Sequence, residues 1–205
     1  MINRFRKYLE ILDVRLSHMF EKQAPFIKCK KGCTYCCKEG EYPLSELEYI
    51  NLMLYYNTLP SEIRGIINEN ISKLIEEDRK KFYECPFLVN ECCSVYPARP
   101  ILCRAFGLIS FKNDGRPKMP FCIDLGLNYS DVYDKEKQML VRCADDGTEP
   151  VAYNVDRRTL RNSEIQDLFD IYFGEDRALI SWLKEDDYFT EDRHNKKALQ
   201  KGPED

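Results

Sequence analysis

The chain has 205 residues, of which 43% are hydrophobic and 32% are charged, and its formal net charge is −4. That length suits one domain and is enough to bury a core without the help of disulfides or metal. The acidic balance leaves no basic excess to neutralise a phosphate backbone, so we expect no general nucleic-acid binding.

The first twenty residues, MINRFRKYLEILDVRLSHMF, interrupt every apolar stretch with charges, so they lack the apolar region of a secretory signal peptide. The sequence also lacks a run of about 18 apolar residues, the length that a membrane-spanning helix requires. We therefore expect a cytoplasmic protein with no membrane contact, and in that compartment thiols stay reduced.

A helix is predicted over 3–22, ending before Pro25, because apolar residues recur on one helical face. These residues are Phe5, Leu9, Leu12, Leu16 and Met19. We interpret this face as packing on the core. An interface with a partner helix is the less favoured alternative.

Two more helices are predicted after the loop CKKGCTYCC. Ser45 and Glu48 have the spacing of a capping box, which predicts a helix through Leu54. A further helix is predicted to start at Pro60 and to reach about Phe82, with regularly spaced isoleucines and leucines on its buried side.

The segment from Cys85 to Cys122 is predicted to be irregular, because five prolines interrupt it. Pro100 is expected to start one short helix and Gly107 to end it. The Asn-Asp-Gly sequence at 113–115 predicts the turn of a small hairpin.

The last third of the chain is predicted to be helical again. Ser163 and Gln166 form a second capping-box pattern, with Gly174 as the expected end of that helix. Its apolar face would contain Ile165, Leu168, Phe169 and Tyr172. Another short helix is expected around Leu179, Ile180 and Trp182.

These elements predict a mainly α fold. We expect a helix-rich single domain over residues 1–185, with an irregular, cysteine-rich metal-binding loop region at about 29–122 and at most a small β-hairpin. Residues 186–205 are charged and are expected to form a flexible tail.

Ten cysteines are the main chemical feature of the sequence, and they gather in its central part. They are Cys29, Cys33, Cys36, Cys37, Cys85, Cys92, Cys93, Cys103, Cys122 and Cys143. Scattered core cysteines would not cluster in this way. Structural disulfides are a weak alternative, since no export signal is seen and adjacent pairs suit a disulfide framework poorly.

The first cysteines have the spacing of a metal loop. Cys29, Cys33 and Cys36 follow a C-x3-C-x2-C pattern, and Gly32 can adopt a turn conformation, so three thiolates can converge on one ion or cluster. Cys37 is adjacent to Cys36, and neighbouring side chains usually point apart. We therefore expect one member of this pair to serve a second metal or a bridging position.

The remaining cysteines complete a second group. Cys85-Pro86 resembles the Cys-Pro found beside iron–sulfur clusters. A proline-stiffened stretch separates Cys93 from Cys103, and Cys122 follows the predicted hairpin. Eight thiolates suit two four-thiolate sites, of either zinc or iron–sulfur type.

The motifs CKKGCTYCC, CPFL and CSVYPARPILCRAFG, in this order, resemble the CxxCxxCC cysteine-cluster family, also named YkgJ-like. Its members are described as zinc- or iron-chelating, and flagellin lysine N-methylases carry a similar cluster. The resemblance covers roughly residues 29–122. It implies metal ligands at Cys29, Cys33, Cys36, Cys37, Cys85, Cys93, Cys103 and Cys122.

This sequence departs from the family pattern at three points. The first spacing is x3 rather than x2, which affects Cys29; Cys92 is an additional cysteine beside Cys93; and Cys143 lies outside the matched motifs. Arg99 and Arg104 flank Cys103 and are expected to neutralise thiolate charge or to donate to sulfur, the alternative being surface salt bridges.

Other chemistry has weaker support. His18 and His194 are the only histidines, and we interpret both as surface residues, so no catalytic residue can be named. We favour an iron–sulfur protein with a redox or methyl-transfer-related role. The alternatives are a zinc protein with closed structural sites that binds a protein partner, and an enzyme similar to the protein lysine N-methylases.

Overall fold

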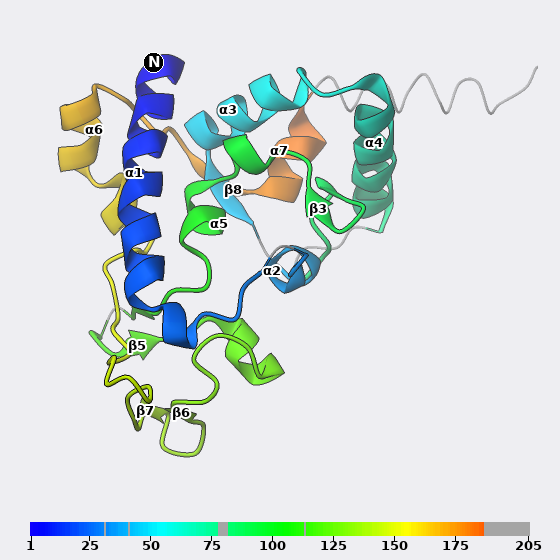
Figure 1. The fold of residues 1–205 in the computed structure, drawn as a ribbon. Coiled ribbons are helices and arrows are strands. Elements are labelled where there is room, and N and C mark those ends of the chain that lie inside the picture. The colour runs from blue at the N-terminus through cyan, green and yellow to red at the C-terminus, as the bar shows by residue number, and fades with distance from the viewer. Residues whose placement is uncertain (31, 41, 78–81, 113, 187–205) are drawn as a thin grey trace, which may run out of the picture. The chain divides into compact units, whose positions relative to one another are not determined.

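The computed structural model describes residues 1–30, 32–40, 42–77, 82–112 and 114–186. Within these ranges the chain forms seven α-helices and short antiparallel strand pairs (Figure 1), which confirms the mainly α prediction. None of the helices found in this part of the chain combines the length and the apolar character that crossing a membrane requires.

The described residues separate into two compact units, each built from two stretches of chain. The first unit contains Met1–Cys36 and Pro100–Phe173. The second contains Cys37–Arg99 and the described residues from Gly174 onward. The cysteine-rich region therefore contributes to both units, and the single domain expected from the sequence stays a prediction.

A long amphipathic helix, α1, forms one side of the first unit (Figure 1). Its bounds and its buried face match the sequence prediction, and Phe5 lies edge-on to Phe173 with ring centroids 5.9 Å apart. The elements of this unit are α1 (Ile2–Lys22), η1 (Ala24–Phe26), α5 (Ile101–Ala105), β4 (Ser110–Phe111), β5 (Pro117–Lys118), η3 (Phe121–Leu125), β6 (Tyr133–Asp134), β7 (Met139–Leu140), η4 (Thr159–Arg161) and α6 (Ser163–Phe169).

A small apolar cluster in the first unit joins distant parts of the chain. Phe26 stacks on Tyr129 with ring centroids 5.6 Å apart, and the Tyr129 N–H donates to the Phe26 carbonyl at 2.9 Å. Ile109, Ile123 and Val132 complete the cluster. Because Phe26 directly precedes the first cysteine loop, this packing brings that loop beside the segment that follows Cys122.

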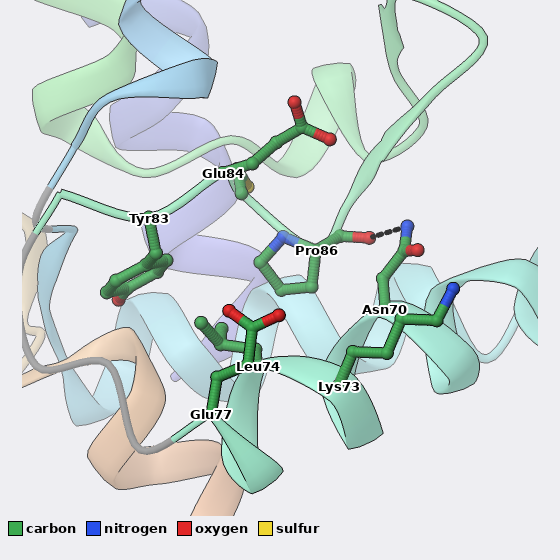
Figure 2. Close-up of a pocket in the computed structure, with 8 residues that line it drawn as sticks. Asn70, Lys73, Leu74, Glu77, Tyr83, Glu84 and Pro86 are labelled. Atoms are coloured by element: carbon green, nitrogen blue, oxygen red, sulfur yellow. Dashed lines mark hydrogen bonds between the residues drawn. The ribbon is translucent and has the colours of Figure 1, made fainter.

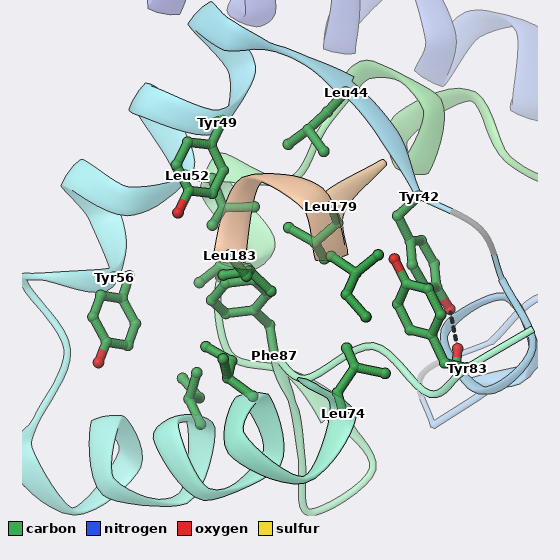
Figure 3. Packing of buried hydrophobic residues seen from close by; sticks show 14 of the residues in the cluster. Tyr42, Leu44, Tyr49, Leu52, Tyr56, Leu74, Tyr83, Phe87, Leu179 and Leu183 are labelled. Atoms are coloured by element: carbon green, nitrogen blue, oxygen red, sulfur yellow. Dashed lines mark hydrogen bonds between the residues drawn. The ribbon is translucent and has the colours of Figure 1, made fainter. Parts of the chain in front are cut away.

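The second unit is built on helices around an aromatic core. Tyr49, Leu52 and Tyr56 from α3 point toward side chains from α4 and α7 (Figure 3), and Tyr49 stacks on Trp182 at 5.3 Å. The elements of this unit are β1 (Pro43–Ser45), α3 (Glu46–Tyr56), α4 (Ser61–Glu76), β2 (Leu88–Val89), β3 (Cys92–Cys93), η2 (Tyr96–Ala98), β8 (Asp176–Ala178) and α7 (Leu179–Glu185). One short helix, α2 (Tyr35–Lys38), contains the division between the units.

Several local predictions are confirmed. The Ser45 side chain accepts from the Glu48 N–H and the Glu48 carboxylate accepts from the Ser45 N–H, which is the predicted capping box of α3. The helix after Pro100, the hairpin of β4 with β5 and the helix at Leu179 are also present, although Asn113 of the predicted turn lies outside the described residues.

The strand content exceeds the prediction of at most one small hairpin. The described residues contain four two-stranded antiparallel pairs, β1–β8, β2–β3, β4–β5 and β6–β7. The turn between β2 and β3 has positive φ at both Asn90 and Glu91, 50° and 56°. Such a turn usually contains glycine, so its sequence gave no hairpin signal.

The boundaries of two helices differ from those predicted. α4 ends at Glu76 rather than near Phe82, which has a φ of 56° and cannot continue a helix. α6 is capped by Asn162, whose side chain accepts from the Ile165 N–H, so the predicted capping box at Ser163 is wrong.

The predicted end and apolar face of α6 are wrong as well. The helix ends with Asp170 in the left-handed conformation, four residues before Gly174. Leu168 is 77% exposed and Tyr172 is 71% exposed, so neither belongs to a buried face. The predicted tail, from residue 187 on, and His194 lie outside the described residues.

Candidate metal centre

The predicted ligands divide between the two units. Cys29, Cys33, Cys36, Cys103 and Cys122 belong to the first unit, and Cys37, Cys85 and Cys93 belong to the second, as does the additional Cys92. The division falls between the adjacent cysteines of α2. All ten cysteines are described, and none of them forms a disulfide in the structure.

A tight turn shapes the first cysteine loop. The Cys33 N–H donates to the Lys30 carbonyl at 2.9 Å, and Gly32 has a φ of 89°, a conformation that side chains rarely adopt. This turn keeps Cys29 and Cys33 at the two ends of a short loop. The spacing inferred from the sequence thus corresponds to a folded-back segment.

The thiols of the first unit lie close enough to influence one another. Burial raises the pKa of Cys29, and Cys33 and Cys36 raise it further, while a hydrogen bond from Asn128 lowers it. Burial raises the pKa of Cys122 to about 11, and Cys29 and Cys33 add to the effect, while the Asn128 backbone N–H lowers it. Cys29, Cys33, Cys36 and Cys122 therefore form one neighbourhood, which we call the first thiol group.

The first thiol group is poorly suited to carry its charge without a cation. Each thiolate would repel its neighbours, and desolvation adds to the cost of ionising them. A bound cation removes both costs, because it neutralises the thiolates that it coordinates. The arrangement therefore favours a cationic occupant over a set of separate anionic thiolates.

A buried amide lies against this group. Asn128 has no exposed surface, and its side-chain nitrogen is 3.2 Å from the Cys29 sulfur and 3.0 Å from the Gly107 carbonyl oxygen. Its side-chain oxygen accepts from the Lys28 N–H at 2.8 Å. Cys29 is exposed as a residue, but its sulfur contacts this fully buried side chain.

Cys103 and its flanking arginines are placed on and beside α5. Arg104 is buried and forms an ion pair with Asp13 of α1. The Arg99 guanidinium lies 3.8 Å from the centre of the Tyr96 ring, and Tyr96 is 60% exposed rather than a core residue. A direct contact from either arginine to a cysteine sulfur stays a prediction.

Three cysteines in the second unit are drawn together by backbone contacts. The Cys85 N–H donates to the Cys37 carbonyl at 2.7 Å, and the Cys85 carbonyl accepts from the Leu88 N–H at 2.9 Å. The β2–β3 hairpin pairs Leu88 with Cys93. We call Cys37, Cys85 and Cys93 the second thiol group.

Cys92 and Cys93 differ in their surroundings. Successive residues of a strand point to opposite faces, so the two side chains of β3 cannot share one environment. Cys93, like Cys85, packs against the apolar core of the second unit, whereas Cys92 is exposed.

A pocket of about 260 Å³ lies next to Cys85. Asn70, Lys73 and Glu77 of the α4 region line one side, and Glu84 and Pro86 line the other (Figure 2). Asn70 donates to the Pro86 carbonyl at 3.2 Å, which ties the Cys-Pro segment to α4. Charged side chains of both signs line the pocket, so its lining selects for neither cations nor anions.

The residues present fit a thiolate-bound metal by their chemistry. Thiolates are the usual ligands of iron–sulfur clusters and of closed zinc sites. Within the described ranges, no three Cys, His, Asp or Glu side chains already form a metal-binding arrangement.

Comparison with known proteins relates this region to a family. Residues 28–123 match the CxxCxxCC family model, described as "putative zinc- or iron-chelating domain". This segment is similar to the CxxCxxCC family over the length of that match. No curated protein and no solved structure matches the chain. The CxxCxxCC description supports metal chelation through the cysteines, with zinc and iron as the two candidate metals.

Asn128 and Gly107 are site residues that sequence reasoning missed. Gly107 was interpreted only as the end of a helix, and Asn128 lies beyond the last predicted ligand and outside the CxxCxxCC match. A buried asparagine has no recognisable motif, because its role depends on which distant groups the fold brings to it.

Proposed function

We propose that this protein binds metal through the cysteine thiolates of its CxxCxxCC domain, and that an iron–sulfur cluster is the preferred occupant. One observation carries the proposal: the first unit brings the folded-back loop of Cys29, Cys33 and Cys36 to the segment that follows Cys122, within residues that match a zinc- or iron-chelating family model. Such a group of thiols is costly to ionise alone and is stabilised by a bound cation.

Two features favour iron–sulfur over a mononuclear site. The donors are thiolates, and an N–H group lies at the sulfur of Cys29, the kind of hydrogen bond that adjusts cluster potentials. Cys85 is followed by proline, as in known cluster motifs. A bound cluster would supply one-electron transfer, so a redox role is the function that we propose.

Zinc is the second candidate. The short folded-back loop with three cysteines, closed by a fourth thiol from Cys122, also suits a tetrahedral zinc site. A closed four-thiolate zinc site leaves no coordination position for substrate, so its role would be structural. The protein would then act through a surface that the metal stabilises.

The second thiol group is proposed to contribute ligands of its own. Cys93 is preferred to Cys92 because it shares the sheltered environment of Cys85, and shelter from water favours a stable metal–thiolate bond. The separation of Cys36 and Cys37 into different units supports different roles for these adjacent residues.

Substitution of single cysteines tests the proposal. Cys36→Ser and Cys122→Ser should each lose most of the metal bound per chain, because loss of one ligand removes binding energy. Cys143→Ser is the matched control and should keep the wild-type content, since Cys143 is exposed and lies outside the domain. Metal content is measured by elemental analysis of the purified variants.

The same measurement distinguishes the paired cysteines. Cys93→Ser should lower the metal content, whereas Cys92→Ser should leave it unchanged. If Cys36→Ser and Cys122→Ser both retain the metal content of the wild type, the proposed function is wrong.

A further inference from the structure

The loop that follows the CxxCxxCC match is tied to the start of the first cysteine loop. The Lys28 ammonium group donates to the Ser130 hydroxyl at 3.0 Å and forms an ion pair with Asp131 at 2.7 Å. It also reaches the Gly126 carbonyl at 3.3 Å. Residues 126–131 are therefore held by contacts with Lys28, the residue directly before Cys29, although they lie about 100 positions further along the chain.

Asn128 occupies the centre of this loop, and its contacts fix the direction of its amide. The side-chain oxygen accepts from the Lys28 N–H, and the nitrogen donates to the Gly107 carbonyl. Rotating the amide by half a turn would set donor against donor and acceptor against acceptor, which costs the hydrogen bonds of a fully buried group. The second hydrogen of the amide nitrogen is thus directed at the Cys29 sulfur.

The same loop is also joined to the Cys122 segment. The Leu127 N–H donates to the Cys122 carbonyl at 3.1 Å. The loop that contains Asn128 therefore contacts two separate cysteine segments, at Cys29 and at Cys122.

We infer that Asn128 is a positioning residue of the metal centre, whose side-chain N–H groups hold the Cys29 sulfur in place while its loop is joined to the Cys122 segment. The inference rests on the proposed function. A hydrogen bond to a thiolate is charge-assisted and is stronger than one to a neutral thiol, so these donors favour the metal-binding form. The metal centre would then extend beyond the CxxCxxCC match, into the loop at 126–131.

Gly107 leaves the space that the Asn128 amide occupies. A Cβ atom at residue 107 would stand 2.8 Å from the Asn128 side-chain nitrogen and 3.5 Å from the Cys29 sulfur. Its φ of 105° also excludes an ordinary side chain. Glycine is therefore needed at this position for the amide to lie between the Gly107 carbonyl and the sulfur.

The test uses the full chain with cobalt(II) as the metal probe, because cobalt–thiolate absorption reports on the sulfur ligands. Asn128→Ala should weaken cobalt binding by about 10- to 100-fold, the usual effect of removing a group that supports a ligand. Its thiolate-to-cobalt absorption band should shift as well. Competition with a chelator gives the affinity, and far-ultraviolet circular dichroism confirms that each variant is folded.

Gln23→Ala is the matched control. Gln23 is 2% exposed, and its side chain bridges the Glu149 carbonyl and the Val151 N–H in the same unit. Its hydrogen bonds within the described residues reach no sulfur atom. This variant should lose a similar amount of stability and keep the cobalt affinity and spectrum of the wild type. A purely structural role for Asn128 would make the two variants behave alike.

Asn128→Asp keeps the inference testable if the alanine variant does not fold. The side chain keeps its shape and can still accept from the Lys28 N–H, but it donates nothing to Cys29 and adds negative charge beside the thiolates. Cobalt binding should again weaken. Wild-type affinity and spectrum in a folded Asn128 variant would overturn the inference alone, whereas absence of cobalt binding by the wild type would overturn the proposed function as well.

Discussion

At the scale of single residues, buried polar side chains are explained by the partners that the fold supplies. Arg104 of α5 is 4% exposed and is paired with Asp13 of α1, so two helices of the first unit are joined through a charge that is shielded from water. Breaking a sheltered ion pair from one side is destabilising, because the remaining charge keeps its desolvation cost.

Removal of the acidic partner should reveal this cost. Asp13→Ala should lower the free energy of unfolding by about 1–3 kcal/mol, because it withdraws the carboxylate from a buried guanidinium. Denaturant-induced unfolding measures the change. Glu10→Ala is the control: its exposed pair with Lys7 lies one turn earlier on the same helix, and its loss should change stability by less than about 0.5 kcal/mol. Equal effects of the two variants would contradict this interpretation.

Single residues also show which parts of the candidate site could be predicted from the sequence. The cysteines could be selected from residue type and spacing, because short loops bring nearby thiols together whatever the rest of the fold. Asn128 could not, because its importance comes from Lys28, Cys29 and Gly107, which only the folded chain brings to it.

At the scale of elements, helix caps were predicted with mixed success. The Ser45–Glu48 pattern specifies the start of α3, and both hydrogen bonds of the box are present. At α6 the same kind of pattern selected Ser163, but the preceding residue, Asn162, has the extended conformation of an N-cap and makes the capping bond. Two adjacent residues with good capping side chains compete, and backbone geometry decides between them.

The cap of α6 can be tested by two neighbouring substitutions. Asn162→Ala should lower the free energy of unfolding by about 1 kcal/mol, because the Ile165 N–H loses its acceptor. Ser163→Ala should change it by less than about 0.5 kcal/mol, since this residue already lies within the helix. Thermal or denaturant unfolding gives both free energies. A larger loss of stability for the serine variant would show that Ser163, as predicted from the sequence, is the cap.

At the scale of the whole molecule, the amphipathic helices could be predicted because their buried faces are long and regular. The buried face of α1 repeats from Phe5 to Leu16, about three turns, whereas α6 has only seven residues, too few for periodicity to define a face. The pairing of β1 with β8 joins residues about 130 positions apart, and no local sequence pattern indicates such a partner.

The division into two units was also beyond the sequence patterns. It falls between two adjacent cysteines and assigns the CxxCxxCC segment to both units. A boundary within a motif leaves no linker composition to mark it. What the motif does predict is metal chelation by cysteines, which the family match supports.

The most direct test of the central claim is elemental analysis for iron, zinc and acid-labile sulfide. It should be made on the full chain, purified without oxygen and without a metal-binding tag, together with a visible spectrum. We predict iron with matching sulfide and broad visible absorption that bleaches on reduction. Zinc without iron would select the structural zinc site instead. A folded chain that contains neither metal and takes up neither would contradict the claim that these cysteines form a metal centre.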